Sequence, residues 1–307
     1  MVFSAVISKK RLVEILRSIL LRIVNFPIPN RSVFGFKGRK FAGYIFYQLT
    51  NFKRRLKYQS NLDYSNLSNY DNQICLSLDQ NGYYISKESE SEVRSRIISE
   101  CSEIVLQSEN IIRKEKSNTN KSFMYNAIKI TGRKTPKVLT DFALDNKYIE
   151  GILKYLGENP RLVSIKILVS NPTKDFERTK SQLFHLDDQA EKMVKLIIPI
   201  TSIDIDSGPF TYIPKKETKR LARKLSYGMP LGDSNISVTN EKKCKLKDYE
   251  IGFLGDRSNT LLIDTSKCFH KGSIDIRRQR VVIIISYNGG ARTTLIKETI
   301  SKNIRPD

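Results

Sequence analysis

The sequence predicts a mainly β protein of the α+β class, an antiparallel sandwich or barrel with flanking helices. After Pro160 the apolar residues alternate with a period of two, as they do along a half-buried strand. Several short β segments then follow one another, and turn residues separate them in place of regular helices. A doubly wound parallel sheet would alternate its strands with helices. The 307 residues are enough for a substantial core, so folding needs no disulfide or metal.

Residues 1–72 are predicted to form a basic N-terminal extension, and residues 73–307 the main domain. The first 70 residues hold 13 Lys and Arg but only two acidic residues, which is about half of the chain's net charge of +21. Apolar residues recur at helical spacing over residues 12–23, which predicts an amphipathic helix. A polar, Asn- and Ser-rich linker over residues 59–72 completes the extension.

Two interpretations of the extension stay open. The apolar stripe of its helix packs on the protein's own core, or it lies in a membrane interface between flanking arginines. The charge excess suits an anionic surface, either nucleic acid or lipid headgroups, and a solubilising tail would have the same composition. Peripheral contact with an anionic membrane through this helix is therefore one interaction that the sequence allows.

The sequence indicates a cytoplasmic protein, with association at a membrane surface left open. No apolar stretch reaches the roughly 18 residues of a spanning helix. The four cysteines are scattered and include no C-x-x-C pair, so they predict neither a zinc ribbon nor a disulfide framework. This use of cysteine fits a reducing compartment.

The first part of the main domain is predicted to be largely helical. A turn over Asp79–Gly82 precedes a short β segment from Tyr83. Apolar spacing predicts a helix from Ser89 to Ser108, with acidic residues near its N-terminus, and the polar residues 113–122 predict a loop. A second helix is expected from Thr140 to Leu156.

The second part is predicted to supply the β segments. They are expected at residues 163–169, 183–186, 193–200, 210–213, 260–264 and 280–287. Turn signals separate them, among them Asp206-Ser207-Gly208-Pro209. The basic stretch Pro214–Ser226 interrupts this series and is expected to be a helix on the surface. No internal repeat is found.

The chemistry-bearing residues are few. The chain lacks the motifs G-x-G-x-x-G, G-x-x-x-x-G-K-[ST], G-x-S-x-G and H-E-x-x-H, which argues against dinucleotide, P-loop, serine-hydrolase and zincin sites. It has only two histidines, His185 and His270. His185 and Asp187 form an H-x-D whose side chains share one face of a strand. If the sheet folds over, His270 completes a two-histidine, one-carboxylate facial triad for iron(II). Structural or surface histidines are the plainer alternative.

Longer stretches around these residues resemble the phytanoyl-CoA dioxygenase family. The strongest likeness lies in Gln182–Asp188, Val194–Thr201 and Ile203–Pro214. Three further segments fit the same family, namely the early strand at Leu78–Tyr83, the segment Tyr155–Pro160, and Leu262–His270 followed by Arg280–Tyr287. The resemblance covers about residues 74–296 and leaves residues 1–70 outside.

The resemblance implies a double-stranded β-helix, the jelly-roll or cupin-like core of iron(II)- and 2-oxoglutarate-dependent oxygenases. His185, Asp187 and His270 would hold the iron as the catalytic centre, and Arg280 would bind the distal carboxylate of 2-oxoglutarate. A guanidinium suits this role because its parallel donors match a carboxylate and its charge survives burial. Arg277 and Arg278 compete for the role, but Arg280 directly precedes the apolar strand.

Two more residues are predicted to contact the cosubstrate. Lys195 interrupts an apolar strand, where it lines the pocket or faces water on a half-exposed strand. Ser273 follows His270-Lys271-Gly272, whereas the family often has His-Gly-Ser, so the extra residue displaces this serine from the family position.

The implied activity consumes 2-oxoglutarate and O2, releases succinate and CO2, and hydroxylates a small-molecule or lipid-like substrate. Desaturation and cyclisation stay open, whereas halogenating relatives lack the carboxylate that Asp187 supplies. One alternative is a nucleic-acid-directed oxygenase, but the charge excess lies outside the catalytic region and no R-x-N-x-T-x-R-like pattern follows His270. The other is a non-catalytic barrel whose basic extension binds membrane or nucleic acid. The substrate and the oligomeric state are not determined by the sequence.

Overall fold

The computed structural model describes the main domain in ten stretches. These are residues 68–88, 91–114, 124–157, 160–172, 180–187, 190, 192–225, 227, 235–272 and 276–289. The predicted N-terminal helix lies outside them, as does most of the predicted linker, so the division after residue 72 stays a prediction. Residues 69–72, which we assigned to the linker, form the first turn of a helix.

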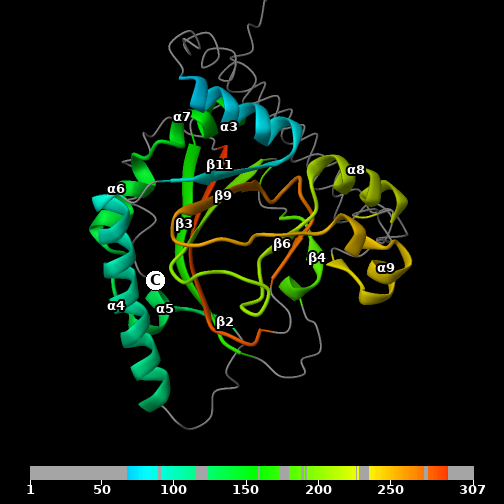
Figure 1. Ribbon diagram of the computed structural model, residues 1–307. Helices are drawn as coiled ribbons and strands as arrows, with labels where there is room; N and C mark the ends of the chain where they lie inside the picture. Colours follow the sequence, from blue (N-terminus) through cyan, green and yellow to red (C-terminus); the bar gives the residue numbers. More distant parts are fainter. Residues whose placement is uncertain are drawn as a thin grey trace, which may run out of the picture.

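Two antiparallel sheets form the core of the described chain (Figure 1). The first has the order β1-β9-β5-β11-β3-β2, with strands Tyr83–Lys87, Asn259–Asp264, Met193–Pro199, Arg280–Gly289, Pro160–Ser170 and Met124–Asn126. The second has the order β7-β4-β10-β6-β8, with strands Asn235–Ile236, Phe184–His185, His270–Lys271, Thr211–Tyr212 and Ile251–Gly252. All the strand pairs in these two sheets are antiparallel.

The order in which the chain visits the sheets defines the fold. From β3 onward the chain passes from the first sheet to the second and back, so that β3, β5, β9 and β11 are neighbours in the first sheet. Strands β4, β10, β6 and β8 are the matching neighbours in the second sheet. This alternation is the double-stranded β-helix, or jelly roll. The predicted mainly β fold with flanking helices is confirmed.

Strand β11 shows how the apolar sequence divides between the two faces of the first sheet. It pairs with β3 on one side and β5 on the other. Val281, Ile283 and Ile285 belong to the core beneath the helices, whereas Val282 and Ile284 belong to the cluster inside the barrel. Successive side chains of a strand point to opposite faces, so a continuous apolar run is buried on both.

The helices cover the outer faces of the two sheets. Helices α3 to α7 pack on the first sheet, and their bounds are Asn69–Gln80, Glu92–Lys114, Ala127–Thr131, Lys137–Leu144 and Ile149–Leu156. Beside the second sheet lie α8, α9 and the 3-10 turn η3, with bounds Lys215–Lys224, Val238–Lys243 and Leu246–Tyr249 (Figure 1). A further 3-10 turn, η2, spans Lys180–Gln182. None of the described helices is both long and apolar enough to cross a membrane.

Two local expectations are corrected. The single helix expected from Thr140 to Leu156 is two helices, α6 and α7. Asn146 separates them because its side chain donates to the Phe142 carbonyl and accepts from the Tyr148 N–H, which competes with helical bonding. The early strand expected at residues 78–83 begins only at Tyr83, because α3 continues to Gln80.

Candidate metal centre

The two histidines face each other across neighbouring strands of the second sheet. His185 on β4 and His270 on β10 are direct cross-strand partners. Such partners have Cβ atoms about 5 Å apart on the same face. Their ring centroids lie 4.3 Å apart. The neighbouring Phe184 and Lys271 point the other way, since the Lys271 ammonium lies 4.2 Å from the Phe184 ring in the cluster outside the barrel.

The same local contact orients both imidazoles. His185 Nδ1 lies 2.8 Å from the Leu183 carbonyl oxygen, and His270 Nδ1 lies 3.1 Å from that of Cys268. A carbonyl oxygen accepts a proton, so each contact favours the tautomer with hydrogen on Nδ1 and a lone pair on Nε2. Metal-binding histidines are usually oriented in this way. The two rings therefore both present Nε2 as the ligand atom.

Asp187 lies just beyond β4 and completes the group. Its backbone N–H donates to the Thr265 carbonyl at 2.9 Å, which ties it to the end of β9. Its Oδ2 atom lies 3.8 Å from His270 Nε2. One ligand atom from each of His185, Asp187 and His270 lies within 4.8 Å of the other two. Two nitrogen ligands and one carboxylate oxygen are a donor set suited to iron(II) with open positions.

The charges around this triad favour its metal-binding protonation state. Burial acts to raise the pKa of Asp187, but Lys195 and His270 outweigh it and lower the pKa, which keeps the carboxyl ionised. Burial, together with the charge of Lys195, lowers the pKa of His270. The imidazole is then neutral at physiological pH, and a neutral imidazole is the form that binds metals.

Lys195 lies inside the barrel and contacts the triad directly. It lies on β5, opposite Ser286 on one neighbouring strand and Ile263 on the other. Its Nζ atom is 2.5 Å from Asp187 Oδ2, and its side chain is 21% exposed. The sequence left open whether the Lys195 side chain points into the barrel or faces water, and in the structure it points into the barrel. The ammonium balances the carboxylate charge in the triad.

Arg280 is a buried cation that has no acidic partner among the residues the structure describes. It begins β11 and is 5% exposed. The guanidinium donates to the Gly208 carbonyl and, at 3.2 Å, to Ser170 Oγ. Its Nε atom has no hydrogen-bond partner in the described part of the chain, where no carboxylate pairs with it either. Burial lowers the pKa of Arg280 to about 10, so the side chain is still charged at neutral pH.

The two competing arginines are occupied elsewhere. Arg277 and Arg278 are exposed and pair with Asp206 and Asp204 in the turn after β5. They are therefore partnered at the surface, whereas Arg280 points into the barrel, on the same face as Val282 and Ile284. Of the three arginines, Arg280 is therefore the one that is buried in the barrel.

One segment connects Arg280 to the triad. The Gly208 carbonyl accepts from Arg280, and two residues later the Phe210 ring lies 5.6 Å from the His270 ring. Phe210 and Tyr212 join the apolar cluster inside the barrel. The buried guanidinium and the candidate ligand His270 are thus linked through Gly208–Phe210.

Tyr212 is a site residue that sequence reasoning did not single out. It is the cross-strand partner of His270 on β6, so it shares the row of the two histidines. It is fully buried, and its hydroxyl has no hydrogen-bond partner among the described residues. The alternation of Phe210 and Tyr212 along the predicted strand was the available signal. Ser273, which was singled out, lies outside the described residues, and its role stays a prediction.

Comparisons with known proteins find solved structures of similar fold but assign the chain to no family. No family model matches the chain, and no curated protein matches it significantly. The resemblance to phytanoyl-CoA dioxygenases therefore stays a prediction.

Solved structures resemble the chain at low identity. The non-haem α-ketoglutarate-dependent epimerase SnoN from nogalamycin biosynthesis has a TM-score of 0.48 and 11% identity over 71% of this chain and 83% of its own. HygX from Streptomyces hygroscopicus, solved with nickel and 2-oxoglutarate, has a TM-score of 0.46 and 12% sequence identity. The match covers 74% of this chain and 89% of HygX. EctD from S. alaskensis, solved with 2-oxoglutarate and 5-hydroxyectoine, has a TM-score of 0.48 and 12% sequence identity. The match covers 73% of this chain and 76% of EctD. These scores lie below 0.5, so the function is argued from the residues of this chain.

Proposed function

We propose that this protein is an iron(II)- and 2-oxoglutarate-dependent dioxygenase, related to the phytanoyl-CoA dioxygenases, that hydroxylates a small-molecule or lipid-like substrate. The observation that carries the proposal is the meeting of His185, Asp187 and His270 inside a double-stranded β-helix. A buried arginine that has no counter-ion among the described residues lies on the same inner surface. A metal triad and an anion anchor are the two features that this chemistry needs.

In this proposal the protein holds the ion and keeps part of its coordination sphere open. His185 and His270 bind through Nε2, and Asp187 binds through a carboxylate oxygen. Bound iron(II) would supply the activation of O2, coupled to oxidative decarboxylation of 2-oxoglutarate. The overall reaction converts 2-oxoglutarate, O2 and a C–H bond into succinate, CO2 and a C–OH group.

Arg280 anchors the distal carboxylate of 2-oxoglutarate. Burying an unpaired charge is costly, and an anionic ligand offsets that cost. Ser170 and the Gly208 carbonyl hold the guanidinium in place, so it can present its remaining donors to the ligand. This geometry suits a carboxylate, which a guanidinium binds with two parallel hydrogen bonds.

The substrate class rests on the character of the inner surface. Phe210, Leu168 and Ile284 are partly exposed apolar side chains inside the barrel and would line the substrate space. Such a wall favours an uncharged or lipid-like group next to the ion, with few polar contacts to orient it.

Turnover of the cosubstrate tests the proposal. Purified protein with iron(II), ascorbate and labelled 2-oxoglutarate is expected to form succinate even without a substrate. His185→Ala and Asp187→Ala should each lower the rate of succinate formation at least about 100-fold. Changes to residues that only support the metal ligands already lower metal affinity or activity about 10- to 100-fold. Arg280→Lys keeps the charge but loses the paired donors, and should raise the KM for 2-oxoglutarate about tenfold with a smaller effect on kcat.

Exposed Asp141 provides a matched control, because it lies on α6, one of the helices outside the first sheet. Asp141→Ala should retain the succinate formation of the unaltered protein. Equal turnover in Asp187→Ala and Asp141→Ala would refute the ligand assignment. Iron uptake without any succinate formation would favour the alternative of a non-catalytic barrel.

A further inference from the structure

Helix α8 presents a stripe of positive charge to solvent. The exposed side chains along it are Lys216, Lys219, Arg220, Arg223 and Lys224. Their spacing of i, i+3, i+4, i+7 and i+8 places them on one face of the helix. The opposite face carries Thr218 and Leu221, which are buried against the second sheet. The apolar side of the amphipathic helix is thus docked on the protein, and only cations point outward.

These cations have no acidic partners in the described part of the chain. The one carboxylate within α8, Glu217, is half-buried and makes no ion pair with described residues. Lys215, at the start of the helix, does pair with Asp79 and is therefore not part of the stripe. A structural helix on a protein surface commonly carries charges of both signs, with pairs three or four residues apart. The stripe departs from that arrangement.

The charge continues onto α9, η3 and the short connection between them. Exposed lysines there are Lys242, Lys243, Lys245 and Lys247, and we call these four residues and the five of α8 the basic surface. Arg220 lies over the ring of Tyr249, 4.8 Å from its centroid, and this contact joins α8 to η3. Buried residues of α8, α9 and η3 also share one apolar cluster.

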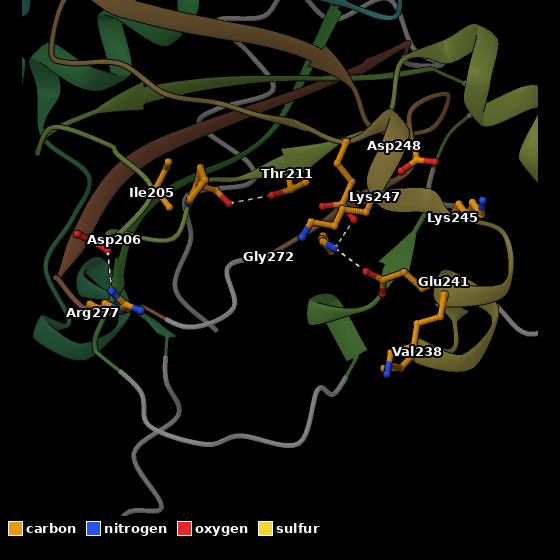
Figure 2. Close-up of a pocket in the computed structure, with 14 residues that line it drawn as sticks. Ile205, Asp206, Thr211, Val238, Glu241, Lys245, Lys247, Asp248, Gly272 and Arg277 are labelled. Carbon is orange, nitrogen blue, oxygen red and sulfur yellow. Dashed lines mark hydrogen bonds and ion pairs between the residues drawn. The ribbon is translucent and has the colours of Figure 1, made fainter.

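The acidic residues nearest the basic surface are mostly turned inward and already paired. A cavity of about 800 Å³ lies on the outer side of the second sheet. Figure 2 shows Lys245 and Lys247 along its lining. Glu241 and Glu250 also line it, and each accepts from the buried Lys271 ammonium at 2.8 Å. Asp248 is the one exposed acid among the described residues of α8, α9 and η3. The basic surface thus has nine exposed cations, whereas the described residues of α8, α9 and η3 include one exposed carboxylate.

We propose that the basic surface docks the protein on an anionic phospholipid membrane. Each Lys or Arg held near such a membrane contributes about a fivefold gain in affinity, so the α8 stripe alone accounts for roughly 10³-fold. A nucleic acid is the other polyanion with matching charge. A single strand would stack its bases on aromatic side chains, but Tyr249, the aromatic side chain beside the stripe, is half-buried beneath Arg220 and is not free to stack on a base. The inference does not depend on the proposed enzymatic function.

Vesicle binding by the full-length chain tests this inference. Wild-type protein is expected to sediment with phosphatidylcholine vesicles that contain phosphatidylserine, and not with vesicles of phosphatidylcholine alone. Lys219→Glu/Arg223→Glu removes two cations from the centre of the stripe and should weaken binding at least about 25-fold, at fivefold for each cation. Raising the salt concentration well above physiological should also weaken wild-type binding, because salt screens the attraction between exposed charges.

Arg133→Glu/Lys134→Glu is the matched control. Both residues are exposed in the turn after α5, and the double change alters net charge by the same amount. This variant should bind vesicles as the wild type does, with thermal melting to show that both variants are folded. Equal loss in the two variants would mean that net charge alone drives binding, and no loss in either would mean that the basic surface is not used. Preference for a DNA duplex over the anionic vesicles, lost in the α8 variant, would make nucleic acid the partner. Each of these three results overturns the proposal.

Discussion

Each candidate histidine is oriented by its own stretch of backbone. In both cases Nδ1 meets the carbonyl oxygen two residues earlier, from Leu183 or Cys268. This contact needs only a short extended segment, so two strands of two residues each suffice to aim both rings. The tertiary fold then has only to place β4 beside β10, which the cross-strand register does.

Lys195 is expected to compete with the metal for Asp187. A divalent ion bound to this carboxylate would lie about 2 Å from its oxygen, where the Lys195 ammonium is now only 2.5 Å away. Two cations about 4 Å apart repel by several kcal/mol, so the lysine must move when the metal binds. Lys195→Met should therefore tighten cobalt(II) binding, measured calorimetrically without cosubstrate, by about tenfold or more.

The same substitution is expected to weaken 2-oxoglutarate binding, because the displaced ammonium would no longer be available to the anionic cosubstrate. Lys129→Met on α5 is the control, since Lys129 is exposed on a helix outside the first sheet and makes no ion pair with described residues. Unchanged cobalt affinity in Lys195→Met, or equal changes in both variants, would show that the Lys195–Asp187 pair has no bearing on metal binding.

At the scale of elements, a buried arginine fixes α4 to the first sheet. Arg94 donates to the carbonyl oxygens of Arg257 and Asn259 and to the Thr260 hydroxyl, all at the start of β9. It also pairs with Glu88 at 3.2 Å. The helix is thereby held against the edge of the sheet by directional bonds as well as by its apolar stripe.

Arg94→Ala is expected to destabilise the protein by about 3 kcal/mol, because it leaves several acceptors near the start of β9 without their donor and removes one of the two cations that pair with the half-buried Glu88 carboxylate. Arg96→Ala, on the exposed side of the same helix, removes only an i,i+4 pair with Glu100 and should cost no more than about 0.5 kcal/mol. Urea unfolding measures both values. A similar cost for the two variants would mean that the buried contacts of Arg94 contribute little.

At the scale of the whole molecule, metal binding should stabilise the barrel, because the triad joins β4, β10 and the end of β9. A ligand at 100 times its Kd adds about 2.7 kcal/mol to the free energy of unfolding. For a domain of this size that corresponds to a rise in Tm on the order of 5–10 °C. Calorimetry with iron(II) or cobalt(II) under nitrogen is expected to show the rise, and a chelator should reverse it.

The Asp187→Ala variant serves as the comparison for that measurement. It should melt at the same temperature with and without metal at this concentration, because one of the three ligands is missing. An equal rise in Tm in this variant would place the stabilising metal elsewhere in the molecule.

Much of the fold follows from local pattern. The β segments expected around residues 163–169, 193–200, 260–264 and 280–287 are strands of the first sheet, since alternation and apolar runs are local properties of the chain. The break between α6 and α7 escaped prediction, because the apolar spacing continues through it and only the side-chain bonds of Asn146 reveal it.

The sequence by itself determined that the chain has two histidines, an H-x-D, and a series of short strands long enough to make a sandwich or barrel. Only the tertiary structure decided that His185 and His270 are cross-strand partners, that Lys195 points at Asp187, and that Arg280 is buried while Arg277 is paired at the surface. The physical reason is that strand register sets these relations. Register depends on pairing between segments about 80 residues apart, and no local pattern carries it.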